Sequence, residues 1–143
     1  MVAYITFLPL HLLSLAVVFV GVILADKQVL AWVRGTQEIL NLQKMIRYHR
    51  LVSVGFGLMI LTGTFLFWPE RSVLLHSTAF YLKMLCVIVL LGNSFVIGAL
   101  LHIPATRSYR SLSTHEKLPL FLSGVFSTLG WVGAGISAFF LLL

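Results

Sequence analysis

Apolar residues along this chain gather in four long runs separated by shorter polar segments. The runs cover roughly residues 4–25, 51–68, 79–103 and 118–143. A helix needs about 20 apolar residues to cross a hydrocarbon core of about 30 Å, and each run reaches or approaches that length. The connections are short and no internal repeat is visible. The pattern therefore predicts an all-α protein, an integral membrane antiparallel four-helix bundle that forms a single transmembrane domain over residues 1–143.

The polar segments predict how these helices are oriented. Links 26–50 and 104–117 must lie on the same side of the membrane, and they hold eight of the ten basic residues: Lys27, Arg34, Lys44, Arg47, Arg50, Arg107, Arg110 and Lys117. The positive-inside rule makes that side cytoplasmic, so both termini are expected on the outer side of a bacterial-type inner (plasma) membrane. Apolar residues mixed into link 26–50 indicate that it extends the first helix or lies at the interface. Pro69 is expected to stop the second helix before a short outer loop.

Composition supports a membrane environment. Hydrophobic types make up 59% of the 143 residues and charged types only 10%, which is incompatible with a water-soluble surface for a chain of this size. The net charge of +6 comes mainly from the two basic links, without the dispersed basic face of a nucleic-acid binder. Membrane lipids are therefore the expected partners, and nucleic acid is not. The single cysteine, Cys86, excludes an internal disulfide.

Small residues mark the faces through which these helices are expected to pack. Lipid provides no hydrophobic drive between helices, so close contacts favour Gly, Ala and Ser. Run 118–143 carries such a face, made of Ser123, Ser127, Gly130, Ala134 and Ser137, and Ser53 with Gly57 forms one on run 51–68. These faces predict contacts with helices of the same chain or with other membrane proteins. No Ser, His and acid set accompanies them, which disfavours a catalytic role for the serines.

Two polar residues inside the runs are candidates for a functional site, because ionisable groups in hydrocarbon are costly. His11 lies about 10 Å, and Lys83 roughly 6 Å, from the outer ends of their runs at about 1.5 Å per residue. His11 shares a helical face with Ser14, Val18 and Gly21, which predicts that it points into the bundle. A histidine there can ligate a haem iron, and a lysine can neutralise a propionate. The alternatives are a helix-to-helix hydrogen bond for His11 and a lysine that extends to the headgroups.

Histidines also gather near the cytoplasmic ends of the runs. His49 lies between basic residues in RYHR, and His102 ends the third run before Pro104. This pair is a candidate for binding a second haem or a metal ion. Single ligands from separate helices without a spacing motif are weak evidence, and polar groups at the membrane surface are usually solvated.

Three segments carry a resemblance to a known family. They are LHLLSLAVVFVGVILADK at residues 10–27, MIRYHRLVSVGFGLMILTGTFLF at 45–67 and FYLKMLCVIVLLGN at 80–93. The chain resembles the HemJ-type protoporphyrinogen oxidases and, more distantly, the copper-resistance CopD-like membrane domain. The resemblance implies a haem b protein that oxidises protoporphyrinogen, with His11 as the candidate iron ligand. It also implies Lys83 as a catalytic residue that contacts the substrate or a propionate.

Three functions are compatible with these features. The first is a membrane protein that binds haem b or a porphyrin, and acts as a redox enzyme that passes electrons to quinone. The second is a cofactor-free accessory subunit of a larger membrane complex, in which His11 and Lys83 hydrogen-bond within the bundle. The third is a small transporter or metal-uptake component, which is disfavoured because no inverted repeat, broken helix or Met and His run is evident.

Overall fold

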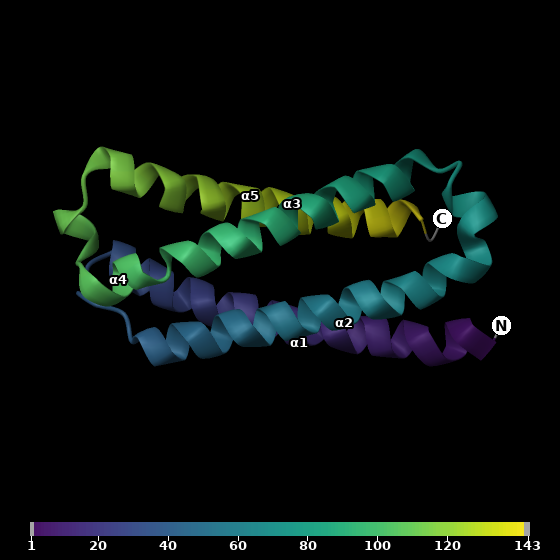
Figure 1. Ribbon diagram of the computed structural model, residues 1–143, viewed down its shortest axis with the longest axis horizontal. Helices are drawn as coiled ribbons and strands as arrows, with labels where there is room; N and C mark the ends of the chain where they lie inside the picture. Colours follow the sequence, from purple (N-terminus) through teal and green to yellow (C-terminus); the bar gives the residue numbers. More distant parts are fainter. Residues whose placement is uncertain (1, 142–143) are drawn as a thin grey trace. The chain divides into compact units, whose positions relative to one another are not determined.

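The computed structural model describes residues 2–141, with side chains described from Thr6 onward. In chain order its elements are α1 (Val2–Val33), α2 (Leu42–Leu74), α3 (Thr78–Leu100), α4 (His102–Thr106), the 3-10 helix η1 (Tyr109–Ser111) and α5 (Thr114–Phe140) (Figure 1). This part of the chain contains no strand. The predicted all-α class is confirmed.

Four of these segments are long and apolar enough to cross a membrane: Thr6–Val33, Leu42–Leu74, Thr78–Thr106 and Thr114–Phe140. Most of their side chains are not buried within the chain. Large apolar residues such as Phe95, Leu13 and Phe121 are largely exposed, as residues that face lipid are. The chain therefore has the composition of a multi-pass membrane protein, as the four apolar runs predicted.

The first link is much shorter than residues 26–50. α1 continues through Asp26 and Lys27 to Val33, and α2 begins at Leu42, which leaves only residues 34–41 outside the two helices. The expectation that this link extends the first helix is confirmed. α1 ends just before Gly35, whose φ of 76° is a conformation that glycine adopts at low cost.

Pro69 does not stop the second helix, so that prediction was wrong. α2 passes through Pro69 and ends at Leu74. A proline inside a helix removes one backbone hydrogen bond, which can kink the helix without ending it. The end of α2 has partners of its own. The Tyr81 hydroxyl donates to the Leu75 carbonyl at 3.0 Å, and the His76 ring nitrogen Nδ1 lies 2.8 Å from the Ser72 carbonyl.

The chain is grouped into two compact units. The first combines the chain up to Glu70 with Leu101–Ser111, and the second combines Arg71–Leu100 with the chain from Leu112 onward. α1 and α2 lie side by side and antiparallel in the first unit, and α3 and α5 do so in the second (Figure 1).

In the first unit, α1 and α2 approach closely through two glycines. A Cβ atom added to Gly55 would lie 2.7 Å from Cγ2 of Val18, and one added to Gly21 would lie 2.7 Å from Cγ2 of Val52. Each valine therefore occupies a space that only glycine leaves open. This reciprocal arrangement sets the register between the two helices.

A cap of buried side chains closes one end of this helix pair. Trp32 is 2% exposed, and its indole N–H donates to the Arg107 carbonyl at 2.9 Å. The Trp32 ring also contacts Tyr109 edge to face, with 5.2 Å between ring centroids. The backbone N–H of Leu40 donates to the Pro104 carbonyl at 2.8 Å. Trp32 at the end of α1 and Leu40 of the first link therefore hold the α4 and η1 segment in place.

In the second unit, α5 packs against α3 through its small residues. Cβ atoms added to Gly130 and Gly133 would lie 2.7 Å from the Leu90 side chain and the Cys86 sulfur, respectively. The buried Asn93 amide donates to the Ser123 carbonyl at 2.9 Å. Ser123, Gly130 and Ser137 are buried, so the small-residue face predicted on the fourth run serves for packing within this chain.

The small-residue face predicted on the second run behaves differently. Ser53 and Gly57 are both exposed. A Cβ atom added to Gly57 would meet nothing within 4 Å in the described part of the chain. Within the chain, α2 packs through Gly55 instead. Contact of the Ser53 and Gly57 face with another membrane protein stays a prediction.

Candidate functional site

His11 is half-buried on α1 and faces α2. The neighbouring positions Ser14, Val18 and Gly21 on the same helical face are buried, which confirms that this face points inward. The Nδ1 atom of His11 lies 2.9 Å from the Thr62 hydroxyl of α2. A histidine inside a predicted span is thus hydrogen-bonded to a polar side chain of the neighbouring helix.

The hydrogen bonds of Thr62 indicate which tautomer His11 adopts. The Thr62 hydroxyl lies 2.7 Å from the Leu58 carbonyl, one turn earlier in α2, and donates its only hydrogen there. It therefore accepts a hydrogen bond from His11, and the proton of the neutral imidazole is on Nδ1. The lone pair is then on Nε2, the form in which an imidazole ligates a metal or accepts a hydrogen bond.

α2 also supports the imidazole ring through Gly63. A Cβ atom added to Gly63 would lie 3.5 Å from Cε1 of His11, so the ring lies against the backbone of α2. Thr62 and Gly63 together restrict the position of the ring. A side chain with this support is oriented before any ligand binds.

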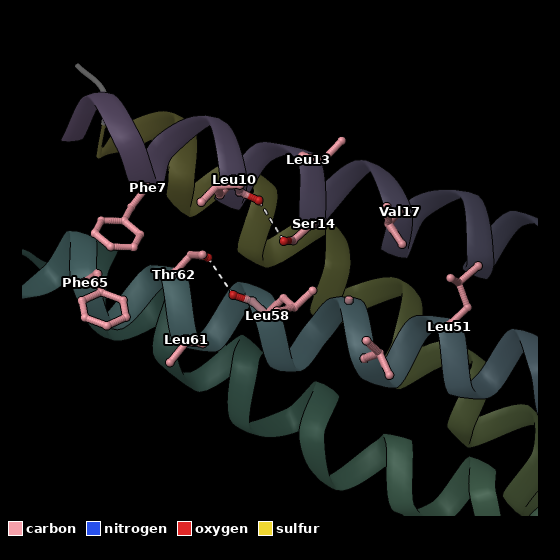
Figure 2. Close-up of a pocket in the computed structure, with 12 residues that line it drawn as sticks. Phe7, Leu10, Leu13, Ser14, Val17, Leu51, Leu58, Leu61, Thr62 and Phe65 are labelled. Atoms are coloured by element: carbon pink, nitrogen blue, oxygen red, sulfur yellow. Dashed lines mark hydrogen bonds between the residues drawn. The ribbon is translucent and has the colours of Figure 1, made fainter. Parts of the chain in front are cut away.

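An apolar groove of about 340 Å³ runs between α1 and α2. It is lined by Phe7, Leu10, Leu13, Ser14 and Val17 of α1, and by Leu51, Val54, Gly55, Leu58, Leu61, Thr62 and Phe65 of α2. Figure 2 shows Phe7 over Phe65 at one end and Leu51 at the other. The two phenylalanine rings are stacked, with centroids 4.5 Å apart and planes 9° apart.

The groove is apolar despite the two hydroxyls in its wall. Ser14 donates to the Leu10 carbonyl at 2.8 Å and Thr62 donates to the Leu58 carbonyl, so both hydroxyl hydrogens bond the backbone of their own helix (Figure 2). His11 is not among the lining residues. Its hydrogen-bond partner Thr62 does line the groove. The macrocycle cavity expected beside His11 stays a prediction.

Lys83 belongs to the second unit, whereas His11 belongs to the first. Lys83 is half-buried on α3, on the same side as Cys86, Leu90 and Asn93, which pack against α5. The sequence grouped Lys83 with these three residues on one half of the helix, and the buried positions agree with that grouping. A pocket shared by His11 and Lys83 stays a prediction.

The two histidines predicted to lie near the cytoplasmic side, His49 and His102, both belong to the first unit. His49 is half-buried in α2, and His102 is exposed at the start of α4. Among residues 2–141, no group of three or more His, Cys, Asp or Glu side chains is arranged to hold a metal ion. A haem needs only one or two histidines, so haem binding by His49 and His102 stays a prediction.

Two features of the first unit were not identified from the sequence. The contact of Trp32 with Arg107 joins residues far apart in the chain, and no local pattern predicts it. The groove has a weak local signal, because Leu51, Val54, Leu58, Leu61 and Phe65 follow alternating steps of three and four along α2. That spacing identifies one helical stripe, but it does not identify the helix that faces it.

Comparison of the chain with protein-family models, with curated proteins and with solved structures finds no match.

Proposed function

We propose that this protein binds haem b through His11 in a bacterial-type inner membrane, with its basic links on the cytoplasmic side. Support comes from the hydrogen bond between His11 Nδ1 and the Thr62 hydroxyl at 2.9 Å. Histidines that ligate metals commonly donate their second ring N–H to a protein acceptor, which fixes the tautomer and raises the basicity of the ligating nitrogen. His11 has this arrangement, with Nε2 as the ligating atom.

The surrounding residues fit such a ligand. Thr62 fixes the tautomer and Gly63 provides a small surface against the ring. Lys83 lies in the other unit, and its proposed role, contact with a propionate or an anionic porphyrin substrate, comes from the resemblance of the sequence alone. Haem b supplies one-electron transfer when bound, and in a redox enzyme of this kind quinone is the proposed electron acceptor.

The first experiment is a spectroscopic count of haem. The full chain is produced with an adequate haem supply and purified in detergent, and its reduced-minus-oxidised spectrum is recorded. Pyridine extraction then gives haem b per chain. We expect near-stoichiometric haem b in the wild type and its loss in His11→Ala, with the far-UV circular dichroism unchanged. A colourless wild type, or full haem in His11→Ala, contradicts the proposal.

Two threonines of α2 provide a matched pair of variants. Thr62→Val removes the hydroxyl that accepts from His11, whereas Thr64→Val removes a hydroxyl that donates to the Ile60 carbonyl of its own helix at 2.9 Å. We expect Thr62→Val to weaken haem retention or shift its midpoint potential, and Thr64→Val to leave both unchanged. Equal effects of the two substitutions would show that the hydroxyl has no role specific to His11.

A second candidate function is that of a cofactor-free subunit of a larger membrane complex. The hydrogen bond from His11 to Thr62 within the helix pair is what this function predicts for the histidine. The open space around Gly57 provides a surface for another helix. Under this alternative the wild type is colourless, and Gly57→Ile abolishes co-purification of a membrane protein partner that the wild type retains.

A further inference from the structure

The groove between α1 and α2 has the shape and chemistry of a site for a lipid chain. Its wall is apolar, and several lining residues are widely exposed, including Leu13 at 62% and Val54 at 59%. On a helix pair that crosses a membrane, such a surface faces acyl chains. An open apolar groove alone does not distinguish one lipid from another, but the residues at its ends do.

One end of the groove leads to basic residues on both helices. On α2, Arg47 lies one turn before Leu51 on the same helical stripe, because residues 47, 51, 54, 58, 61 and 65 follow steps of four and three. Arg47 is exposed. The line of apolar residues in α2 therefore continues directly to a guanidinium group.

Lys27 of α1 lies at the same level as Arg47. Gly21 faces Val52 across the antiparallel pair. Lys27 is six residues after Gly21 in α1, and Ile46 is six residues before Val52 in α2. Lys27 is therefore level with Ile46, the residue next to Arg47. Lys27 is also exposed. Asp26, the neighbouring carboxylate, is on the opposite side of α1 from the groove by helical spacing. Lys27 lies 14 residues, about four helical turns, after the groove-lining Leu13, so it is on the Leu13 side of the groove. Two cations from two helices thus flank this end of the groove.

The other end of the groove is closed by aromatic side chains. Phe7 and Phe65 stack there with 4.5 Å between ring centroids. The α2 wall from Leu51 to Phe65 is about 21 Å long at about 1.5 Å per residue. One leaflet contributes about half of a hydrocarbon core of about 30 Å. The groove is therefore long enough to hold an acyl chain whose headgroup is at the Lys27 and Arg47 end.

We propose that the α1 and α2 pair binds one anionic phospholipid, with its phosphate between Lys27 and Arg47 and an acyl chain along the groove toward Phe7 and Phe65. Charge complementarity selects this occupant, because an anionic headgroup gains from two cations and a neutral lipid gains far less. The acyl chain occupies the groove and contacts its apolar wall. The guanidinium of Arg47 provides two N–H donors for the phosphate. This lipid site does not include His11, the proposed haem ligand.

Native mass spectrometry of the protein from nanodiscs tests this proposal. The nanodiscs contain equal amounts of phosphatidylglycerol and phosphatidylcholine with the same palmitoyl and oleoyl chains, so only the headgroup differs. We expect wild type to retain one phosphatidylglycerol in preference to phosphatidylcholine. Arg47→Gln should lower that preference by about fivefold, the factor expected for the loss of one basic side chain near an anionic lipid. Lys27→Gln should act in the same direction.

Matched variants separate a bound lipid from general attraction. Arg34→Gln removes one charge from residues 34–41, away from the groove, and should leave the preference unchanged. Val54→Trp fills the groove and should remove the retained lipid, whereas Val132→Trp, at a 53% exposed position of α5, should not. Equal retention of the two lipids, or equal losses in a variant and its control, would overturn the proposal. Retention of an isoprenoid quinone that Val54→Trp displaces would also overturn it.

Discussion

Replacement of Gly55 by alanine tests the close contact that places Thr62 opposite His11. The added Cβ would lie 2.7 Å from Cγ2 of Val18 and 3.4 Å from the backbone carbonyl oxygen of Ser14. Carbon atoms in optimal contact are about 3.5–4.0 Å apart, so the helices must separate locally by about 1 Å. Val18 cannot readily turn away, because it is 0% exposed and a valine in a helix has one preferred rotamer.

Two opposing contributions determine the magnitude. Overpacking of a tight contact costs about 1–3 kcal/mol. Alanine favours the helix over glycine by up to about 1 kcal/mol, which offsets part of that cost. Gly57 is also inside α2 but has no neighbour within 4 Å of an added Cβ atom. Gly57→Ala therefore gains the helix propensity of alanine without the cost of overpacking. The difference between the two variants therefore isolates the steric cost and should be about 1–3 kcal/mol.

The assay is equilibrium unfolding in mixed micelles of a mild detergent and dodecyl sulfate, followed by tryptophan fluorescence. We expect Gly55→Ala to unfold at a lower dodecyl sulfate fraction than wild type, and Gly57→Ala to unfold at the same or a higher fraction. If Gly55→Ala were as stable as Gly57→Ala, the contact between α1 and α2 at Val18 would not exist as described. The register that brings Thr62 to His11 would then lose its support.

Two further predictions concern the contacts that hold each unit together. Trp32→Phe keeps an aromatic ring but removes the N–H that donates to the Arg107 carbonyl, so we expect about 1 kcal/mol lower stability and faster amide hydrogen exchange in the α4 and η1 segment. If exchange in this segment were unchanged, the hydrogen bond would not contribute. Asn93→Leu removes the buried amide that joins α3 to α5 and should cost about 0.6 kcal/mol in the same unfolding assay, within a range up to about 1.7. Wild-type stability in Asn93→Leu would show that this hydrogen bond is replaced without loss.

Some properties of this protein follow from local patterns in the sequence. Four apolar runs identify the four membrane-length helices, because each run alone must satisfy the length and polarity that a bilayer demands. The inward face of His11, Ser14, Val18 and Gly21 also follows from a local rule, the period of the α-helix. The position at which a helix ends depends less on local sequence alone. α2 passes through Pro69, because the loss of one backbone hydrogen bond does not by itself end a helix.

The partner of His11 depended on the tertiary structure. Thr62 is opposite His11 only because Val18 enters the space at Gly55 and Val52 enters the space at Gly21, which sets how far one helix is shifted along the other. That shift results from contacts between residues distant in the sequence, so no periodicity within one helix contains it. For the same reason the groove, with its cations at one end, emerges only when α1 and α2 are placed together. The sequence by itself determined the helices and their inward faces, whereas the register between α1 and α2 decided which residues meet.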